Sequence, residues 1–129
     1  MDPVNHFELP AKDRNRANSF YATVFGWQIQ TMDEMGMPYT IVRTTEVDDN
    51  NMCVEKGAIN GGIMDADETG TAPMIVITVK SIEDTLTKIQ ENGGEKLVDK
   101  MPVGEMGHYA RFKDSEGNVM GLWEEVTKQ

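Results

Sequence analysis

The chain has a single cysteine, Cys53, among its 129 residues, and it has no long run of hydrophobic residues. One cysteine cannot form an intrachain disulfide or build a thiolate metal site, and short apolar runs exclude a transmembrane helix. Basic residues are also scarce, because 12 Lys and Arg stand against 22 Asp and Glu, which gives a net charge of −10. Such a charge repels phosphate backbones and anionic lipids, so we expect no nucleic-acid partner and no membrane partner.

The remaining composition is that of an ordinary globular protein. Hydrophobic residues make up 39% and charged residues 26% of the chain, which is typical of one folded domain of this length. Residues 1–5 show no basic region that leads into an apolar core, so we expect no signal peptide. The composition therefore predicts a cytoplasmic protein with a single domain over residues 1–129.

The first half of the chain shows the pattern of a strand, a helix and three further strands. Asp13 is the predicted N-cap of the helix, and Gly26 ends it. Between them, apolar residues recur at the spacing of one helix face; they are Ala17, Phe20, Tyr21, Val24 and Phe25. The predicted strands cover residues 4–9, 27–30, 39–43 and 58–64.

The second half repeats this order. Residues 73–79 form a β-branched run that is typical of a strand buried on both faces. Ser81 and Asp84 have the spacing of a capping box at the start of a helix, which residues 92–94, Asn-Gly-Gly, then end. Strands are predicted over 95–98, 109–113 and 119–125, with residues 114–118 as the turn of a hairpin.

Matching positions in the two halves lie 68 residues apart. The pairs are His6 and Met74, Asp13 and Ser81, and Gly26 and Gly94. This constant offset indicates a duplicated unit and predicts the α+β class. We expect module one at about residues 4–64, a linker over 65–72 and module two at about 73–126.

Both ends of the chain resemble the vicinal oxygen chelate superfamily, which includes glyoxalase I, bleomycin-resistance proteins and extradiol dioxygenases. Its first module is similar to residues 6–13, 19–21 and 24–27, which read His-Phe-Glu-Leu-Pro-Ala-Lys-Asp, Ser-Phe-Tyr and Val-Phe-Gly-Trp. Its closing hairpin is similar to residues 112–123, Phe-Lys-Asp-Ser-Glu-Gly-Asn-Val-Met-Gly-Leu-Trp. The resemblance implies two βαβββ modules that form a cupped eight-stranded mixed sheet with the helices outside, and it implies a homodimer.

The resemblance also allows a test for a metal site. Metal-dependent members of the superfamily hold one divalent ion on four side chains, two from each module, on the first and last strands. His6 falls on the first of these positions, whereas Met74 and Gly121 fall on two others, and the pair Gly61 and Gly62 lies near the fourth. Because only one of four ligands is present, we expect no metal site and no cofactor of the usual kind.

Strand alternation selects the residues that would line the cup. They are His6 and Glu8 in module one, then Met74, Val76, Thr78, Val119, Gly121 and Trp123 in module two. Tyr39 and Trp123 could stack on a planar guest, so Tyr39 joins the candidate ligand-binding residues. The opposite strand faces would pack under the helices; they carry Phe7, Leu9, Ile75, Ile77, Val79, Met120 and Leu122.

Three kinds of function stay open at this point. The first is a glyoxalase- or bleomycin-resistance-like protein with a degenerate metal site that binds a small apolar or aromatic molecule in its cup. The alternative is a metal-dependent lyase, isomerase or dioxygenase of the same superfamily that uses His6 and Glu8, with His108 and Glu124 as further donors near the strands. The third is a regulatory or assembly subunit in which the dimer surface, and not the cup, carries the function. No residue is assigned a catalytic role by the sequence.

Overall fold

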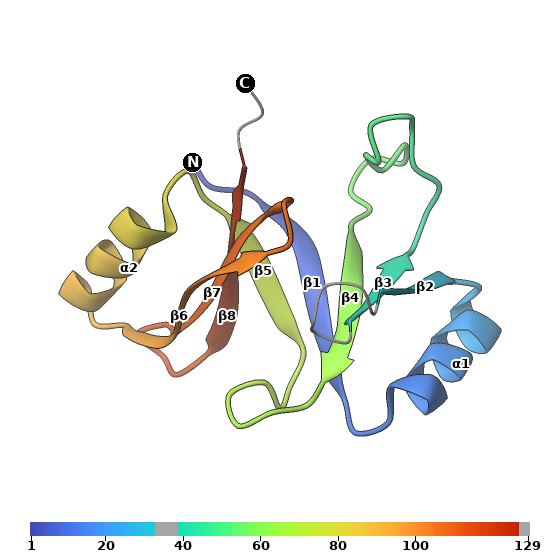
Figure 1. The fold of residues 1–129 in the computed structure, drawn as a ribbon, viewed down its shortest axis with the longest axis horizontal. Coiled ribbons are helices and arrows are strands. Elements are labelled where there is room, and N and C mark those ends of the chain that lie inside the picture. The colour runs from blue at the N-terminus through green and yellow to red at the C-terminus, as the bar shows by residue number, and fades with distance from the viewer. Residues whose placement is uncertain (33–38, 127–129) are drawn as a thin grey trace. The chain divides into compact units, whose positions relative to one another are not determined.

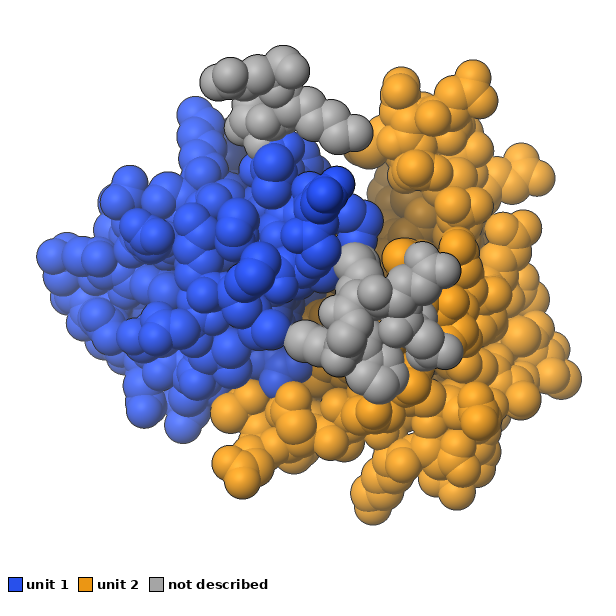
Figure 2. All heavy atoms as spheres, in the orientation of Figure 1, with its two compact units in different colours: residues 1–5, 74–129 blue, residues 6–73 orange. Residues whose placement is uncertain are grey.

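The computed structural model describes residues 1–32 and 39–126, and the chain divides into two compact units. The N-terminal unit comprises residues 6–73, and the C-terminal unit comprises residues 74–129 together with residues 1–5. Figure 2 colours them orange and blue. Residues 1–5 join the C-terminal unit because the Thr78 amide donates to the Pro3 carbonyl, and the Thr78 hydroxyl donates to Asn5 Oδ1 at 2.7 Å.

The N-terminal unit is a four-stranded mixed sheet with one helix. Its elements are β1 (Val4–Ala11, of which the first two residues belong to the other unit), α1 (Arg14–Phe25), β2 (Gln28–Met32), β3 (Tyr39–Arg43) and β4 (Asn60–Asp65) (Figure 1). The strands lie in the order β2-β3-β4-β1. The β1–β4 pair is parallel, and the other pairs are antiparallel.

The C-terminal unit repeats this topology. Its elements are β5 (Met74–Thr78), α2 (Ile82–Glu91), β6 (Glu95–Val103), β7 (Gly107–Lys113) and β8 (Val119–Glu125), and the strand order is β5-β8-β7-β6. The β5–β8 pair is parallel, whereas β7 pairs antiparallel with both neighbours. Eight strands with mixed pairing and two helices confirm the predicted α+β class and the repeated strand and helix order.

Local side-chain chemistry starts and stops the elements as the sequence predicts. The Asp13 carboxylate accepts from the Arg16 amide at 3.0 Å, and Ser81 Oγ accepts from the Asp84 amide at 3.1 Å, so both residues are N-caps. The predicted Gly26–Gly94 match is off by one residue. The left-handed conformation at the end of the first helix falls on Gly26 (φ 72°), but after the second helix it falls on Gly93 (φ 91°), because α2 is shorter.

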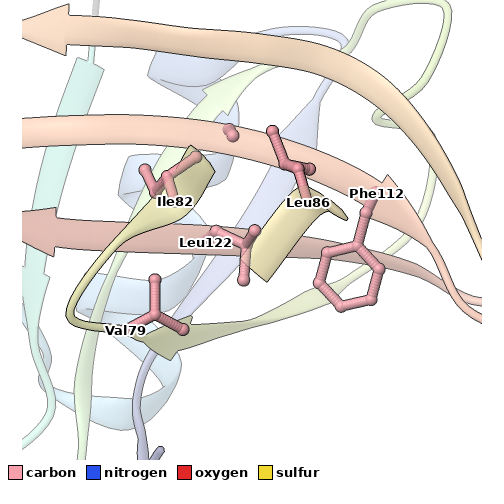
Figure 3. Packing of buried hydrophobic residues seen from close by; sticks show 6 residues of the cluster. Val79, Ile82, Leu86, Phe112 and Leu122 are labelled. Atoms are coloured by element: carbon pink, nitrogen blue, oxygen red, sulfur yellow. The ribbon is translucent and has the colours of Figure 1, made fainter. Parts of the chain in front are cut away.

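Helix α2 covers its sheet with a conventional apolar core (Figure 3). Ile82 and Leu86 point from the helix toward buried residues of the sheet and of the loop before the helix; these are Val79, Ala110, Phe112 and Leu122. Ile77 and Met120 pack against the same cluster, so they lie on the helix side as strand alternation predicts. Ile75 is 39% exposed, and the prediction that residues 73–79 are buried on both faces is therefore wrong at this position.

Helix α1 packs differently, because none of its residues is buried. Its half-buried residues are Arg14, Ala17, Asn18 and Tyr21, and Phe20, Val24 and Phe25 are more than half exposed. Only part of the predicted apolar stripe therefore faces the sheet. Instead, Arg14 and Asn18 both donate to the hydroxyl of buried Thr40 at 3.4 Å.

Within the part of the chain that the structure describes, neither helix is long and apolar enough to cross a membrane.

Candidate functional site

Three polar side chains form a hydrogen-bonded chain on one face of the N-terminal unit. His6 and Glu8 alternate along β1 and therefore share the face opposite α1, which we call the helix-distal face. His6 Nε2 lies 2.9 Å from the Tyr39 hydroxyl, and that hydroxyl donates to Glu8 Oε2 at 3.2 Å. Glu8 is buried, with 5% of its surface exposed. The structure thus brings together three of the predicted site residues.

A glycine makes room for the tyrosine in this chain. In the β3–β4 pair Ile41 lies opposite Gly62, and Tyr39 is two residues earlier on β3, so its ring can lean across the glycine. A Cβ built on Gly62 would overlap the hydroxyl and ring of Tyr39. Any residue larger than glycine would therefore displace the phenol that connects His6 to Glu8.

The C-terminal unit has the same arrangement at equivalent positions. On β7 and β8 Arg111 lies opposite Gly121, and Tyr109 is again two residues earlier. A Cβ on Gly121 would lie 3.1 Å from the Tyr109 ring and 3.1 Å from Val76. Since β1 pairs Glu8 with Gly62 and β5 pairs Val76 with Gly121, the duplication extends to a tyrosine that leans over a glycine.

Arg111 gives this second tyrosine a charged partner. Arg111 Nε donates to the Tyr109 hydroxyl at 2.8 Å, and its guanidinium carbon lies 5.5 Å from the ring centroid. Arg111 is only 5% exposed. The sequence analysis missed both residues, although alternation back from the predicted hairpin turn at 114–118 would place them on the face of Gly121.

Burial of the His6 imidazole lowers its pKa from 6.5 to about 4, because desolvation penalises the charged ring. The ring is therefore neutral at pH 7. The Tyr39 hydroxyl donates to Glu8 and is also the hydrogen-bond partner of His6 Nε2. His6 Nε2 is therefore already engaged within the unit.

These residues do not fit the four-ligand metal site of the superfamily. The parallel register identifies Gly62, not Gly61, as the equivalent of Gly121. The expected ligand positions on the last, or closing, strand of each module are therefore both glycines, which have no donor atom. Met74 is the second-module counterpart of His6, and a thioether is a poor ligand for a hard divalent ion. Across the described ranges, 1–32 and 39–126, no three His, Cys, Asp or Glu side chains gather around a point that could hold a metal ion.

The other predicted ligand-binding residues lie on the helix-distal face of the C-terminal unit. Met74 and Val76 are buried at 4% and 2% exposure. The Thr78 hydroxyl is engaged with Asn5. Trp123 lies over Gly107, where a Cβ would come within 2.6 Å of the indole, so the indole packs on its own sheet.

His108 and Glu124, the further donors considered from the sequence, lie on the opposite face, beside α2. They pair across β7 and β8, and Glu124 Oε1 accepts from the Ile82 amide at 2.8 Å while Oε2 lies 3.1 Å from Lys100 Nζ. The Ile82 amide, followed by Lys100, lowers the pKa of Glu124. This carboxylate stabilises the N-terminus of α2.

Comparison of the sequence with known proteins finds a matching family model and a similar protein. The family model "Bleomycin resistance protein-like N-terminal" matches residues 4–44. A glyoxylase-like domain-containing protein of Didymella fabae is 26% identical over 120 residues, which cover 92% of this chain and 91% of that protein.

Two solved structures show the same fold. A hypothetical protein from Bacillus halodurans has a TM-score of 0.68 at 16% identity, over 100% of this chain and 98% of its own. A methylmalonyl-CoA epimerase variant of Streptomyces coelicolor, in complex with 2-nitronate-propionyl-CoA, has a TM-score of 0.69 at 14% identity, over 100% and 98%. Fold and sequence signatures together confirm the resemblance to the vicinal oxygen chelate superfamily, and within it to glyoxalase- and bleomycin-resistance-like proteins.

Proposed function

We propose that this protein binds a small, mainly apolar or aromatic molecule on its helix-distal sheet faces, without a resident metal ion. The observation that carries the proposal is the Tyr39 hydroxyl, which lies between His6 and Glu8 and fills the space above Gly62. In place of a closing-strand metal ligand, the N-terminal unit has a phenol held by its own hydrogen bonds. The superfamily resemblance implies that these faces line a cup.

The chemistry of the faces supports an uncharged or weakly polar aromatic ligand. The N-terminal unit offers a neutral imidazole, a phenol and a carboxylate, which can orient a ligand by hydrogen bonds. The C-terminal unit offers the apolar side chains of Met74 and Val76, and Val76 and the Tyr109 ring both lie near Gly121. Aromatic rings on these faces, accompanied by few polar groups, favour a planar ligand that can stack on them.

The second candidate is the metal-dependent lyase, isomerase or dioxygenase that would use His6 and Glu8. The hydrogen bond between His6 and Tyr39 weighs against it, because Nε2 would first have to give up this partner before it could bind a metal ion. We propose no catalytic role in a metal-dependent reaction for any residue of the chain. The cytoplasmic location and the homodimer that the sequence and the resemblance imply remain part of the proposal.

The test is a fragment screen followed by heteronuclear NMR on chelator-treated protein. We expect aromatic fragments to shift the backbone amides of Glu8 and Gly62. Tyr39→Phe, which removes only the hydroxyl, should weaken the best fragment about fivefold, the value of one hydrogen bond. Ser19→Ala is the matched control, since it also removes only a hydroxyl, at an exposed position of α1, and it should leave the affinity unchanged.

Two results would contradict the proposal. Fragments that bind only after a divalent ion is added would favour the metal-dependent enzyme. Equal affinities of Tyr39→Phe and Ser19→Ala for the fragment would show that the hydrogen-bonded chain does not contact the ligand.

A further inference from the structure

The N-terminal unit has a groove on its other face, between the first half of α1 and the end of β1. Its volume is about 350 Å³, which lies at the lower end of the range for ligand sites. Its apolar wall includes Leu9, Ala17, Phe20, Tyr21 and Ile63. All of its lining residues belong to the N-terminal unit, and α1 covers this face, so the groove is separate from the chain of His6, Tyr39 and Glu8.

The charged residues of the groove are confined to one end. Lys12, Asp13 and Arg16 are its charged lining residues, and all three lie at or before the first turn of α1. The apolar residues that α1 contributes follow them along the helix. The groove therefore has a charged end and an apolar body.

The charged end is electropositive in an otherwise acidic chain. The first turn of α1 contains no acidic residue, and Asp13 is engaged as the N-cap through the Arg16 amide. Arg14 forms an ion pair with Asp65 at 2.9 Å. Among the described residues, in contrast, neither the Lys12 ammonium nor the Arg16 guanidinium forms an ion pair, and both side chains are exposed.

The apolar body continues onto unusually exposed surface. Phe20 is 54% exposed, and Val24 and Phe25, further along α1, are 55% and 60% exposed. A helix of this length gains most of its stability from packing, yet α1 has no buried residue. An apolar ligand in the groove would cover part of Phe20 and bring α1 the packing that it lacks.

We infer that this groove binds an anionic amphiphile, a carboxylate with a short alkyl or aryl body. Charge complementarity fixes the orientation. The carboxylate meets Lys12 and Arg16, where the positive end of the α1 dipole adds to the attraction. The body lies along Ala17, Phe20 and Tyr21 over Leu9.

Calorimetric titration with octanoate and with 1-octanol tests this inference, because the two probes share a chain and differ in charge. We expect octanoate to bind more tightly than octanol. The double variant Lys12→Gln/Arg16→Gln should weaken octanoate about tenfold and leave octanol unchanged. Ala17→Leu fills the groove and should weaken both probes.

Two control variants make the result specific. Lys56→Gln removes an exposed positive charge elsewhere in the same unit and should change neither affinity. Tyr39→Phe reports on the helix-distal face and should leave octanoate binding intact, so the failure of this inference and the failure of the proposed function are distinguishable.

Three results would overturn the inference. The first is equal binding of octanoate and octanol, and the second is octanoate affinity within about twofold of wild type in the double variant. The third is that octanoate does not bind and that the protein forms a dimer which Phe20→Ser dissociates. That result would show that the groove is a contact surface between two copies of the chain.

Discussion

Neutral, half-buried His6 makes the folded protein sensitive to mild acid. Its pKa is about 4 in the folded state against 6.5 for an exposed histidine, so the unfolded chain takes up the proton first as the pH falls. The contribution to stability is present above pH 6.5 and is lost as the pH falls toward 4. Because the folded and unfolded states have these two different pKa values, the free energy of unfolding should fall by about 2 kcal/mol between pH 7 and pH 5.

The assay is urea unfolding at pH 7 and at pH 5, for wild type and for His6→Gln. Glutamine cannot titrate, and its amide can still donate toward the Tyr39 oxygen. The two proteins differ only at residue 6, so the comparison isolates the contribution of that side chain. The variant should therefore lose about 2 kcal/mol less than wild type over this interval. Equal losses in the two proteins would refute the lowered pKa of His6 in the folded state.

Three further predictions concern stability and are checked by urea unfolding. Leu86→Ala should cost about 2–5 kcal/mol because it opens a cavity in the core, whereas Val24→Ala, on an exposed site, should cost less than about 0.5 kcal/mol; similar values would contradict the difference between the helices. Glu124→Gln should cost about 1 kcal/mol at pH 7, since it weakens the cap of α2, and this difference from wild type should shrink as acid protonates the carboxylate. Gly62→Ala should cost about 1–3 kcal/mol by overpacking, and a prior Tyr39→Ala change should remove most of that cost.

The sequence predicts the order of strands and helices because that order depends on local signals. Asp13 and Ser81 cap helices through their own side chains, and the turn at 114–118 is fixed by Asp114, which accepts from the amides of Glu116 and Asn118. Such interactions span a few residues and can be recognised from spacing alone. The strand ends are less well predicted, since β6 continues to Val103 instead of ending near residue 98.

The packing of α1 could not be predicted in the same way. Periodicity identifies Phe20 and Val24 as part of an apolar stripe, but it does not say whether a sheet covers that stripe. In the structure Arg14 lies on the side of α1 that faces the sheet. There it donates to the buried Thr40 hydroxyl and forms an ion pair with the exposed Asp65. These partners lie 26 and 51 residues away in the chain, so the choice of face depends on tertiary structure.

The sequence predicts that His6, Glu8 and Tyr39 lie near one another, but it does not predict how they are hydrogen-bonded. Alternation correctly groups His6 with Glu8, and the proposal of Tyr39 as a stacking residue places it near them. The bridging hydroxyl depends on the register that sets Tyr39 diagonally across from Gly62, which spacing along one strand does not reveal. The equivalent pair, Tyr109 over Gly121, follows from the same register in the second half.

Metal binding tests the central claim most directly. Chelator-treated protein is melted with and without Ni²⁺, Zn²⁺, Mn²⁺ or Fe²⁺, beside the variant His6→Ala. A ligand at a hundred times its Kd stabilises the folded state by about 2.7 kcal/mol, which shifts Tm by several degrees. The account predicts no shift that depends on His6, because Tyr39 occupies its Nε2 and no closing-strand ligand is present. A rise in Tm that His6→Ala abolishes would contradict it and would favour the metal-dependent enzyme.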